Sequence, residues 1–126
     1  MYRIAIFVLA ALMCAATSAQ ARWKAEYASQ PQEVRDWYEQ AELTPAAKAR
    51  LHFQKCCASS EVVRTKFRVN KSSGQDEWEW LDKDTWRVVP PDIIHVDEYA
   101  PDGQPTLFVL PGSNIPTCFY PGRGGL

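Results

Sequence analysis

Two hydrophobic periods divide this chain. Between residues 31 and 54, apolar side chains recur every three to four positions, which is the spacing of one helix face. Thr44 and Pro45 interrupt this stretch, and a threonine N-cap followed by proline in the first turn is typical of a new helix. The pattern therefore predicts two short helices, one from 31 to about 40 and one from 46 to about 54.

Beyond residue 60 the period changes from helical to two. Runs rich in valine, phenylalanine and tryptophan alternate with polar residues and are separated by Gly, Pro, Asp and Ser turns. One later run is continuously apolar, as in a strand buried on both faces. The predicted strands are 63–69, 76–80, 85–89, 106–110 and 117–120. We expect an α+β protein, with the short N-terminal helical pair followed by a bent five-stranded antiparallel, SH3-like sheet.

The first three strands suggest a register. Setting Phe67 opposite Trp78, and Trp80 opposite Trp86, gathers the aromatic residues on one face and the charges on the other. We interpret Trp78, Trp80 and Trp86 as core, with a ligand-stacking aromatic platform as the alternative. The opposite face would be a solvated ladder of basic and acidic residues, namely Arg64, Lys66, Arg68, Arg87, Glu77 and Glu79.

The N-terminus has the order of a secretory signal. Arg3 precedes the apolar run Ile4–Cys14, and Ser18–Ala21 supplies an A-x-A cleavage pattern, so the mature chain is expected to begin at Arg22. The run is shorter than the roughly 20 residues of a membrane-spanning helix. We therefore expect a periplasmic or secreted protein without a transmembrane span in the mature chain. Its predicted parts are a signal peptide (1–21), an exposed lead-in (22–30), one globular domain (31–121) and a mobile tail (122–126).

Composition agrees with one globular domain. The 126 residues are 46% hydrophobic and 23% charged, and the formal net charge is −1. Such a charge gives no electrostatic reason to expect nucleic acid or an anionic membrane as a partner.

The cysteines carry the sharpest signal. Cleavage of the signal removes Cys14 and leaves Cys56, Cys57 and Cys118, an odd number in an oxidising compartment. Adjacent cysteines rarely bond each other, so we expect one of the pair to bond Cys118 and tie the helical part to the last strand. The sequence leaves open which one, and one thiol remains over.

A metal or redox site is the alternative reading of these cysteines. His52 precedes Cys56 by four residues, so on a helix both side chains would share a face. With Cys57 and Cys118 they would form a Cys₃His set for zinc or copper. We favour the disulfide and expect no cofactor, because no CxxC spacing is present and exported thiols usually oxidise.

Catalytic signals are weak. Acid–base catalysis by paired carboxylates needs one raised pKa, and nothing in the sequence supplies it for the four acidic candidates Glu77, Glu79, Asp82 and Asp84. His95 and Asp97 stand close together, but no serine or cysteine is in a recognisable nucleophile setting. We therefore favour a non-catalytic protein over an enzyme, and a cell-wall hydrolase is the third hypothesis.

Four short segments together carry a resemblance. They are the Val-Arg-Asp-Trp-Tyr of 34–38, the Cys-Cys of 56–57, the Trp-led strand ending in proline at 86–90, and the Cys-Phe-Tyr-Pro of 118–121. In this combination the chain resembles small uncharacterised exported proteins of alphaproteobacteria and their phages. Many of those carry another cysteine soon after the pair, whereas residues 58–61 here contain none. The resemblance supports location and architecture and implies no activity.

The sequence thus predicts an exported, disulfide-stabilised module that binds a protein or a cell-envelope component. Its contact sites are expected in the loops Asp97–Gly103 and Pro111–Pro116, because loops on a rigid scaffold carry function more often than the sheet does. The alternative is a periplasmic metal-handling or thiol-redox protein using His52 and the three cysteines. Partner and oligomeric state stay open.

Overall fold

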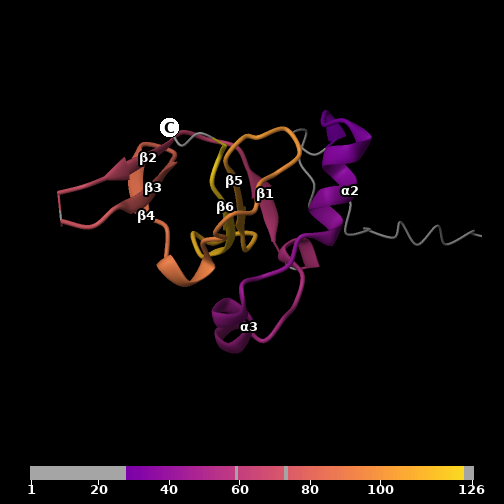
Figure 1. The fold of residues 1–126 in the computed structure, drawn as a ribbon, viewed down its shortest axis with the longest axis horizontal. Coiled ribbons are helices and arrows are strands. Elements are labelled where there is room, and N and C mark those ends of the chain that lie inside the picture. Colours follow the sequence, from indigo (N-terminus) through magenta and orange to yellow (C-terminus); the bar gives the residue numbers. More distant parts are fainter. Residues whose placement is uncertain (1–27, 59, 73, 124–126) are drawn as a thin grey trace, which may run out of the picture.

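A computed structural model describes residues 28–58, 60–72 and 74–123. The predicted signal peptide, Cys14, residues 22–27 of the lead-in and residues 124–126 of the tail lie outside the described residues. The described part has the expected α+β character, with helices first and strands after (Figure 1). None of its helices has the length and apolar character needed to cross a membrane.

Two helices form near the predicted positions. Helix α2 (Gln32–Gln40) turns Val34 and Tyr38 into the core. Helix α3 (Pro45–Leu51) begins as expected, since the Thr44 hydroxyl oxygen accepts a hydrogen bond from the Ala47 N–H at 3.1 Å. It ends three residues before the predicted end, because His52 adopts a left-handed conformation with φ of 62° that stops the helix.

The strands form two sheets, so the prediction of one five-stranded sheet is wrong. One sheet has the order β1-β5-β6 and the other β2-β3-β4, and all pairings are antiparallel. The 3₁₀ turns η2 (Cys56–Ala58) and η3 (Pro91–Ile93) precede and follow strands β1 to β4 (Figure 1). The strand bounds are β1 Glu61–Val63, β2 Phe67–Asn70, β3 Glu77–Asp82, β4 Thr85–Val88, β5 Thr106–Val109 and β6 Pro116–Tyr120.

The predicted strand 63–69 divides between the two sheets. Its first part pairs with β5 and its last part with β3, and the break lies at residues 64–66. Here side chains bridge the segment to its surroundings: Arg64 donates to the Tyr38 hydroxyl at 2.7 Å, and the Thr65 hydroxyl donates to the Leu81 carbonyl at 2.8 Å. One alternating run therefore serves two sheets, a division that its period alone does not reveal.

The molecule is layered, with β1-β5-β6 in the middle. Helix α2 covers one face of this sheet, where Trp37 lies edge-on to Tyr120 with ring centroids 4.7 Å apart. The second sheet covers the other face, where the centroids of Phe67 and Trp78 each lie 5.2 Å from that of Phe119. Strands β5 and β6 are consequently buried at every position.

The register of β2 and β3 differs from the prediction by two residues. Phe67 lies opposite Trp80 rather than Trp78, and Arg68 lies opposite Glu79. A two-residue shift preserves the faces because side chains alternate with a period of two. The same residues of this hairpin therefore share faces as predicted, with different partners. The charged face is not the solvated one that we expected, because Glu79 is buried.

The register of β3 and β4 differs by one residue, which reverses the faces. Trp86 lies opposite Leu81, and Arg87 lies opposite Trp80. The physical reason is the turn: Asp82 pairs with Thr85, so only two residues connect the strands, and a two-residue loop determines the register.

The three-tryptophan face is therefore a prediction that the structure contradicts. Trp80 is only 3% exposed and belongs to the core, and Trp78 packs against the core. Trp86 stands on the opposite face, where the Arg68 guanidinium lies 4.1 Å from its ring centroid. No common platform of Trp78, Trp80 and Trp86 exists, because the short β3–β4 turn places Trp86 on the other side of the sheet.

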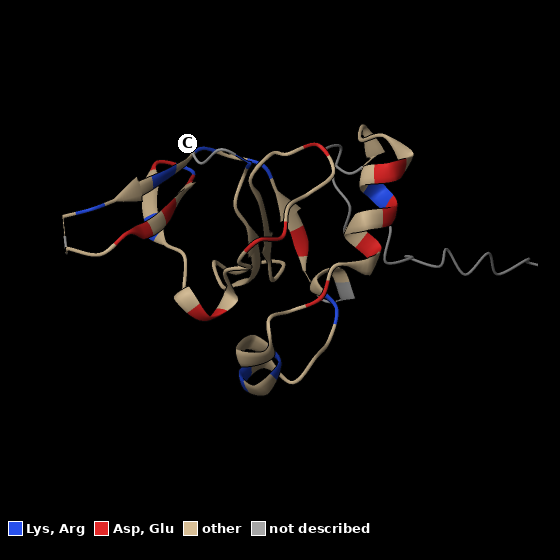
Figure 2. Ribbon diagram, viewed as in Figure 1, with Lys and Arg blue, Asp and Glu red and all other residues tan. Residues whose placement is uncertain are grey.

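The charged side chains of this sheet pair, though not as the predicted ladder. Arg68 Nε lies 2.8 Å from a Glu79 carboxylate oxygen, and Arg87 Nε lies 2.7 Å from one of Asp82. Arg64 pairs instead with Asp102, at 2.8 Å. The acidic residues of β3 accordingly lie between the basic residues of β2 and β4 (Figure 2).

Candidate functional site

A disulfide joins Cys56 in η2 to Cys118 in β6, and both residues are fully buried. The prediction that one of the adjacent cysteines bonds Cys118 is confirmed, and the structure identifies it as Cys56. The bond closes a loop with a sequence separation of 62, for which chain-entropy reasoning gives roughly 4 kcal/mol of stabilisation. It ties the turn next to α2 to the middle sheet.

Cys57 is the free cysteine among the described residues, and it is half-buried. Burial raises the pKa of its thiol, and the nearby Glu39 carboxylate adds to this effect. The side chain is therefore a protonated thiol at neutral pH, which is a weak nucleophile.

His95 lies beside the disulfide and is held from three directions. Its backbone N–H donates to the Phe119 carbonyl at 2.9 Å, which places it against β6. Its ring stacks on Tyr120 with centroids 3.9 Å apart and planes 7° from parallel. Its Nδ1 lies 3.3 Å from a Glu98 carboxylate oxygen. Only 8% of the residue is exposed, so its position is well determined by packing.

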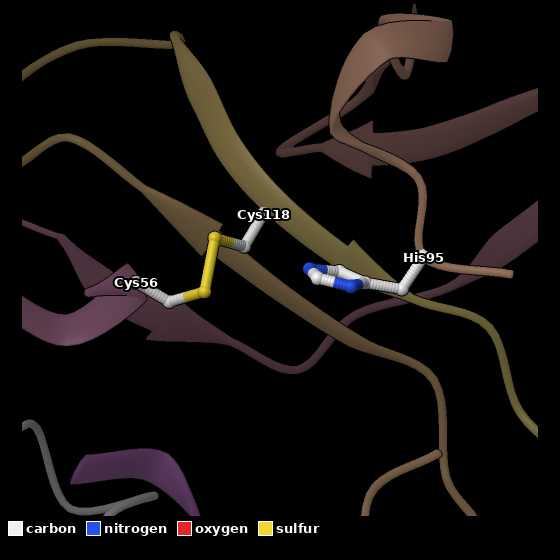
Figure 3. A group of neighbouring side chains, drawn as sticks. All are labelled: Cys56, His95 and Cys118. Atoms are coloured by element: carbon white, nitrogen blue, oxygen red, sulfur yellow. A yellow bond between two sulfur atoms is a disulfide. The ribbon is translucent and has the colours of Figure 1, made fainter. Parts of the chain in front are cut away.

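The other ring nitrogen of His95 has no partner. Nε2 is buried and makes no hydrogen bond with the described residues. In Figure 3 the ring edge farthest from Cβ points toward the sulfur atoms. One ring nitrogen and the sulfurs of Cys56 and Cys118 all lie within 4.8 Å of one another.

The His95 side chain is a neutral imidazole at pH 7. Burial lowers its pKa below the ordinary value, and the Glu98 carboxylate and the Glu42 backbone carbonyl oppose that effect only in part. If the ring proton is on Nδ1, the nitrogen 3.3 Å from the Glu98 carboxylate, the lone pair is on Nε2, on the side of the disulfide.

The structure assembles a different cluster from the one predicted. Cys56 and Cys118 of the predicted set come together, and His95 lies next to them. His52 lies exposed at the end of α3. Sequence reasoning noted His95 only for its closeness to Asp97. The apolar neighbours Ile93, Ile94 and Val96 are the sequence signal that could have indicated a buried histidine at this position.

Two hollows flank the segment that carries His95. The larger, about 710 Å³, lies between residues 40–48 and this segment, and the smaller, about 340 Å³, is lined by Trp78, Tyr99 and Pro121 among others. Both share Ile94, His95 and Val96 in their linings. Val96 is 77% exposed and Tyr99 39%. The segment thus forms a ridge between two concave surfaces, on which the apolar Val96 and Tyr99 flank the exposed acidic residues Asp97 and Glu98.

The two predicted contact loops both border hollows. Asp97–Gly103 contributes Asp97 and Tyr99 to the smaller hollow just described. Pro111–Pro116 contributes Gly112, Ser113 and Asn114 to a third hollow of about 770 Å³, which lies between the two sheets.

The carboxylates considered for catalysis do not form an isolated pair. Glu79 and Asp82 each form an ion pair with an arginine, as described for the second sheet, whereas Asp84 is exposed in the β3–β4 turn.

No family model, no curated protein and no solved structure matches the chain.

Proposed function

We propose that this protein is an exported, disulfide-stabilised, non-catalytic module that binds a protein or a cell-envelope component through the ridge of residues 94–99. One observation carries the proposal: two large apolar side chains, Val96 and Tyr99, are exposed on a segment whose His95 is packed into the core. Exposed apolar groups between concave surfaces are typical of recognition sites.

The anchoring of His95 at the base of the ridge supports this role. The His95 backbone is bonded to β6, its ring is stacked on Tyr120, and the next strand position, Cys118, is covalently bonded to Cys56. A surface that is ordered before binding loses little conformational entropy on association. The disulfide then serves recognition by anchoring the layer beneath the ridge.

The surroundings of His95 support the non-catalytic part of this proposal. Its unpartnered nitrogen faces a disulfide, which supplies neither a proton nor a nucleophile. The free Cys57 carries a raised thiol pKa, opposite to that of an activated nucleophile.

The test measures co-sedimentation of the protein with peptidoglycan sacculi and with outer-membrane vesicles from cells that produce it. We expect the double variant Val96→Asp, Tyr99→Ser to lose at least about tenfold in bound fraction, because it removes most of the exposed apolar area of the ridge. Both side chains are exposed, so circular dichroism and the unfolding midpoint should remain those of the wild type.

The matched control is Ile115→Asp, an apolar residue 46% exposed in the Pro111–Pro116 loop. It should bind as the wild type does. Equal binding by the ridge variant, or a loss confined to Ile115→Asp, would contradict the ridge as the binding surface. No binding of the wild type to either fraction would contradict an envelope component as its ligand.

A further inference from the structure

His95 and the two cysteines of the disulfide are together a set of metal-binding side chains, whose sulfurs are here joined to each other. Two sulfurs and one imidazole nitrogen converge within 4.8 Å, and all three residues are at least nine-tenths buried. The histidine nitrogen on this side has no hydrogen-bond partner, although buried polar atoms are rarely left unpaired.

The opposite side of the ring adds an independent observation. Metal-binding histidines almost always direct their second nitrogen to a carboxylate or a carbonyl, which orients the ring and increases the basicity of the ligating nitrogen. His95 Nδ1 faces the Glu98 carboxylate at 3.3 Å in this way. The stacked Tyr120 further restricts ring rotation.

We propose that the dithiol form of this protein, in which Cys56 and Cys118 are not yet joined, binds one thiophilic d¹⁰ cation, Cu(I) or Zn(II), through these two sulfurs and His95 Nε2. Thiolate and imidazole are the ligands that both ions favour. Within the same 4.8 Å limit the described chain supplies three protein ligands. Three ligands suit trigonal Cu(I), and Zn(II) would take water in a fourth position.

The metal distances can be reached from the observed backbone. With metal–sulfur bonds of about 2.3 Å, two thiolates on one ion lie about 3.8–4.0 Å apart. The Cα atoms of Cys56 and Cys118 are 5.8 Å apart, so rotation of the two side chains can separate the sulfurs without displacing β6 or η2.

Metal and disulfide are mutually exclusive outcomes for the same two thiols. Metal binding releases the two thiol protons and forms two metal–sulfur bonds and one metal–nitrogen bond. Disulfide formation removes two protons and two electrons, which pass to an oxidant that itself carries a disulfide and is reduced to two thiols. The chain therefore becomes either the metal-bound form or the disulfide form, according to whether the thiols react first with the cation or with the oxidant.

The test uses protein expressed from the full sequence, so that the host carries out any processing. Because both sulfurs are fully buried, the disulfide is reduced in guanidinium chloride by a phosphine, which takes up oxygen from water as the two thiols form. The denaturant and phosphine are then removed without air, with Cu(I), with Zn(II) or with neither. Bound metal is measured by mass spectrometry of the element, and affinity by competition with a coloured chelator.

We expect one equivalent of metal in the reduced protein and none in the oxidised protein. His95→Phe, which retains a ring to stack on Tyr120, should weaken binding by more than the roughly 10–100-fold that loss of an outer partner causes, and Glu98→Gln should weaken it within that range. His52→Ala and Cys57→Ser are the matched controls and should bind as the wild type does.

A second readout remains valid if the reduced chain does not fold without metal. Bound metal should protect Cys56 and Cys118 from alkylation and leave Cys57 modified, and it should raise the unfolding midpoint of the reduced protein. Absence of metal binding with both ions, or equal affinity in His95→Phe, would overturn the proposal. Loss of binding in His52→Ala or Cys57→Ser with retention in His95→Phe would overturn it in favour of the set predicted from the sequence.

Discussion

The two sheets use opposite designs. Strands β5 and β6 are buried at every position and contain no charged residue, whereas the strands of β2-β3-β4 mix buried, partly buried and exposed positions and carry paired charges (Figure 2). The middle sheet lies between α2 and the second sheet, so β5 and β6 exclude water on both faces, whereas the edge strand β1 is partly exposed. The difference shows that position in the layers, rather than strand type, determines how tolerant each strand is of change.

The largest expected effect is in the middle sheet. Phe119→Ala should lower the free energy of unfolding by about 3–5 kcal/mol, because it removes a fully buried ring that contacts Phe67 and Trp78. Val88→Ala in β4, which is 50% exposed, is the matched comparison and should change it by about 0.5 kcal/mol or less. Urea unfolding of both variants measures the contrast, and similar losses would contradict the layered description.

An intermediate effect is expected where the two designs meet. Tyr38→Phe should cost about 1 kcal/mol at neutral pH, because it removes the hydroxyl that accepts from Arg64 and leaves the ring packing unchanged.

The same variant should also alter alkaline stability. Burial raises the pKa of Tyr38 above its ordinary value of 10.0, although Arg64 opposes this. Above pH 10 the unfolded chain loses this proton while the folded chain retains it, so the stability of the wild type falls as pH rises toward the folded pKa. Urea unfolding from pH 9 to 11, in a Cys57→Ser background that prevents thiol exchange, should give a shallower decline for Tyr38→Phe. A decline of equal slope in both proteins would show that Tyr38 titrates alike in the folded and unfolded chains.

The smallest effect tests the register of the outer sheet. A double-mutant cycle between Arg68 and Glu79 should give a coupling energy of about 0.2–1 kcal/mol, because the Arg68 side chain is 47% exposed to screening by solvent although Glu79 is buried. The same cycle with Glu77, the partner predicted from the sequence, should give a coupling near zero. Reversed values would support the predicted register over the observed one.

Local patterns predicted much of this fold. The threonine cap before Pro45 marks the start of α3, and the apolar run at 106–110 contains β5. The same patterns gave wrong strand pairings where two possible pairings differ only in residues that are distant along the chain. The alternating run at 63–69 shows no sign of its division between two sheets, and the two-residue turn after Asp82 outweighs the apparent benefit of placing Trp86 beside Trp80.

The candidate site, too, could be predicted only in part from the sequence. Cys118 was predicted as a disulfide partner because of the cysteine count and the expected export, yet nothing in the sequence distinguished Cys56 from Cys57. His95 lies 39 positions from Cys56 and 23 from Cys118 along the chain, and a contact over such distances depends on packing that no local pattern encodes.

The sequence by itself therefore determined the element types, the continuous apolar run of the middle sheet and the existence of a bond to Cys118. These follow from side-chain periodicity, turn chemistry and cysteine number, which act over a few residues or over composition as a whole. The tertiary structure alone decided the division into two sheets, the face of Trp86 and the meeting of His95 with the disulfide. The physical reason is that these features depend on which layers cover one another, and burial against a distant partner is a property of the whole fold.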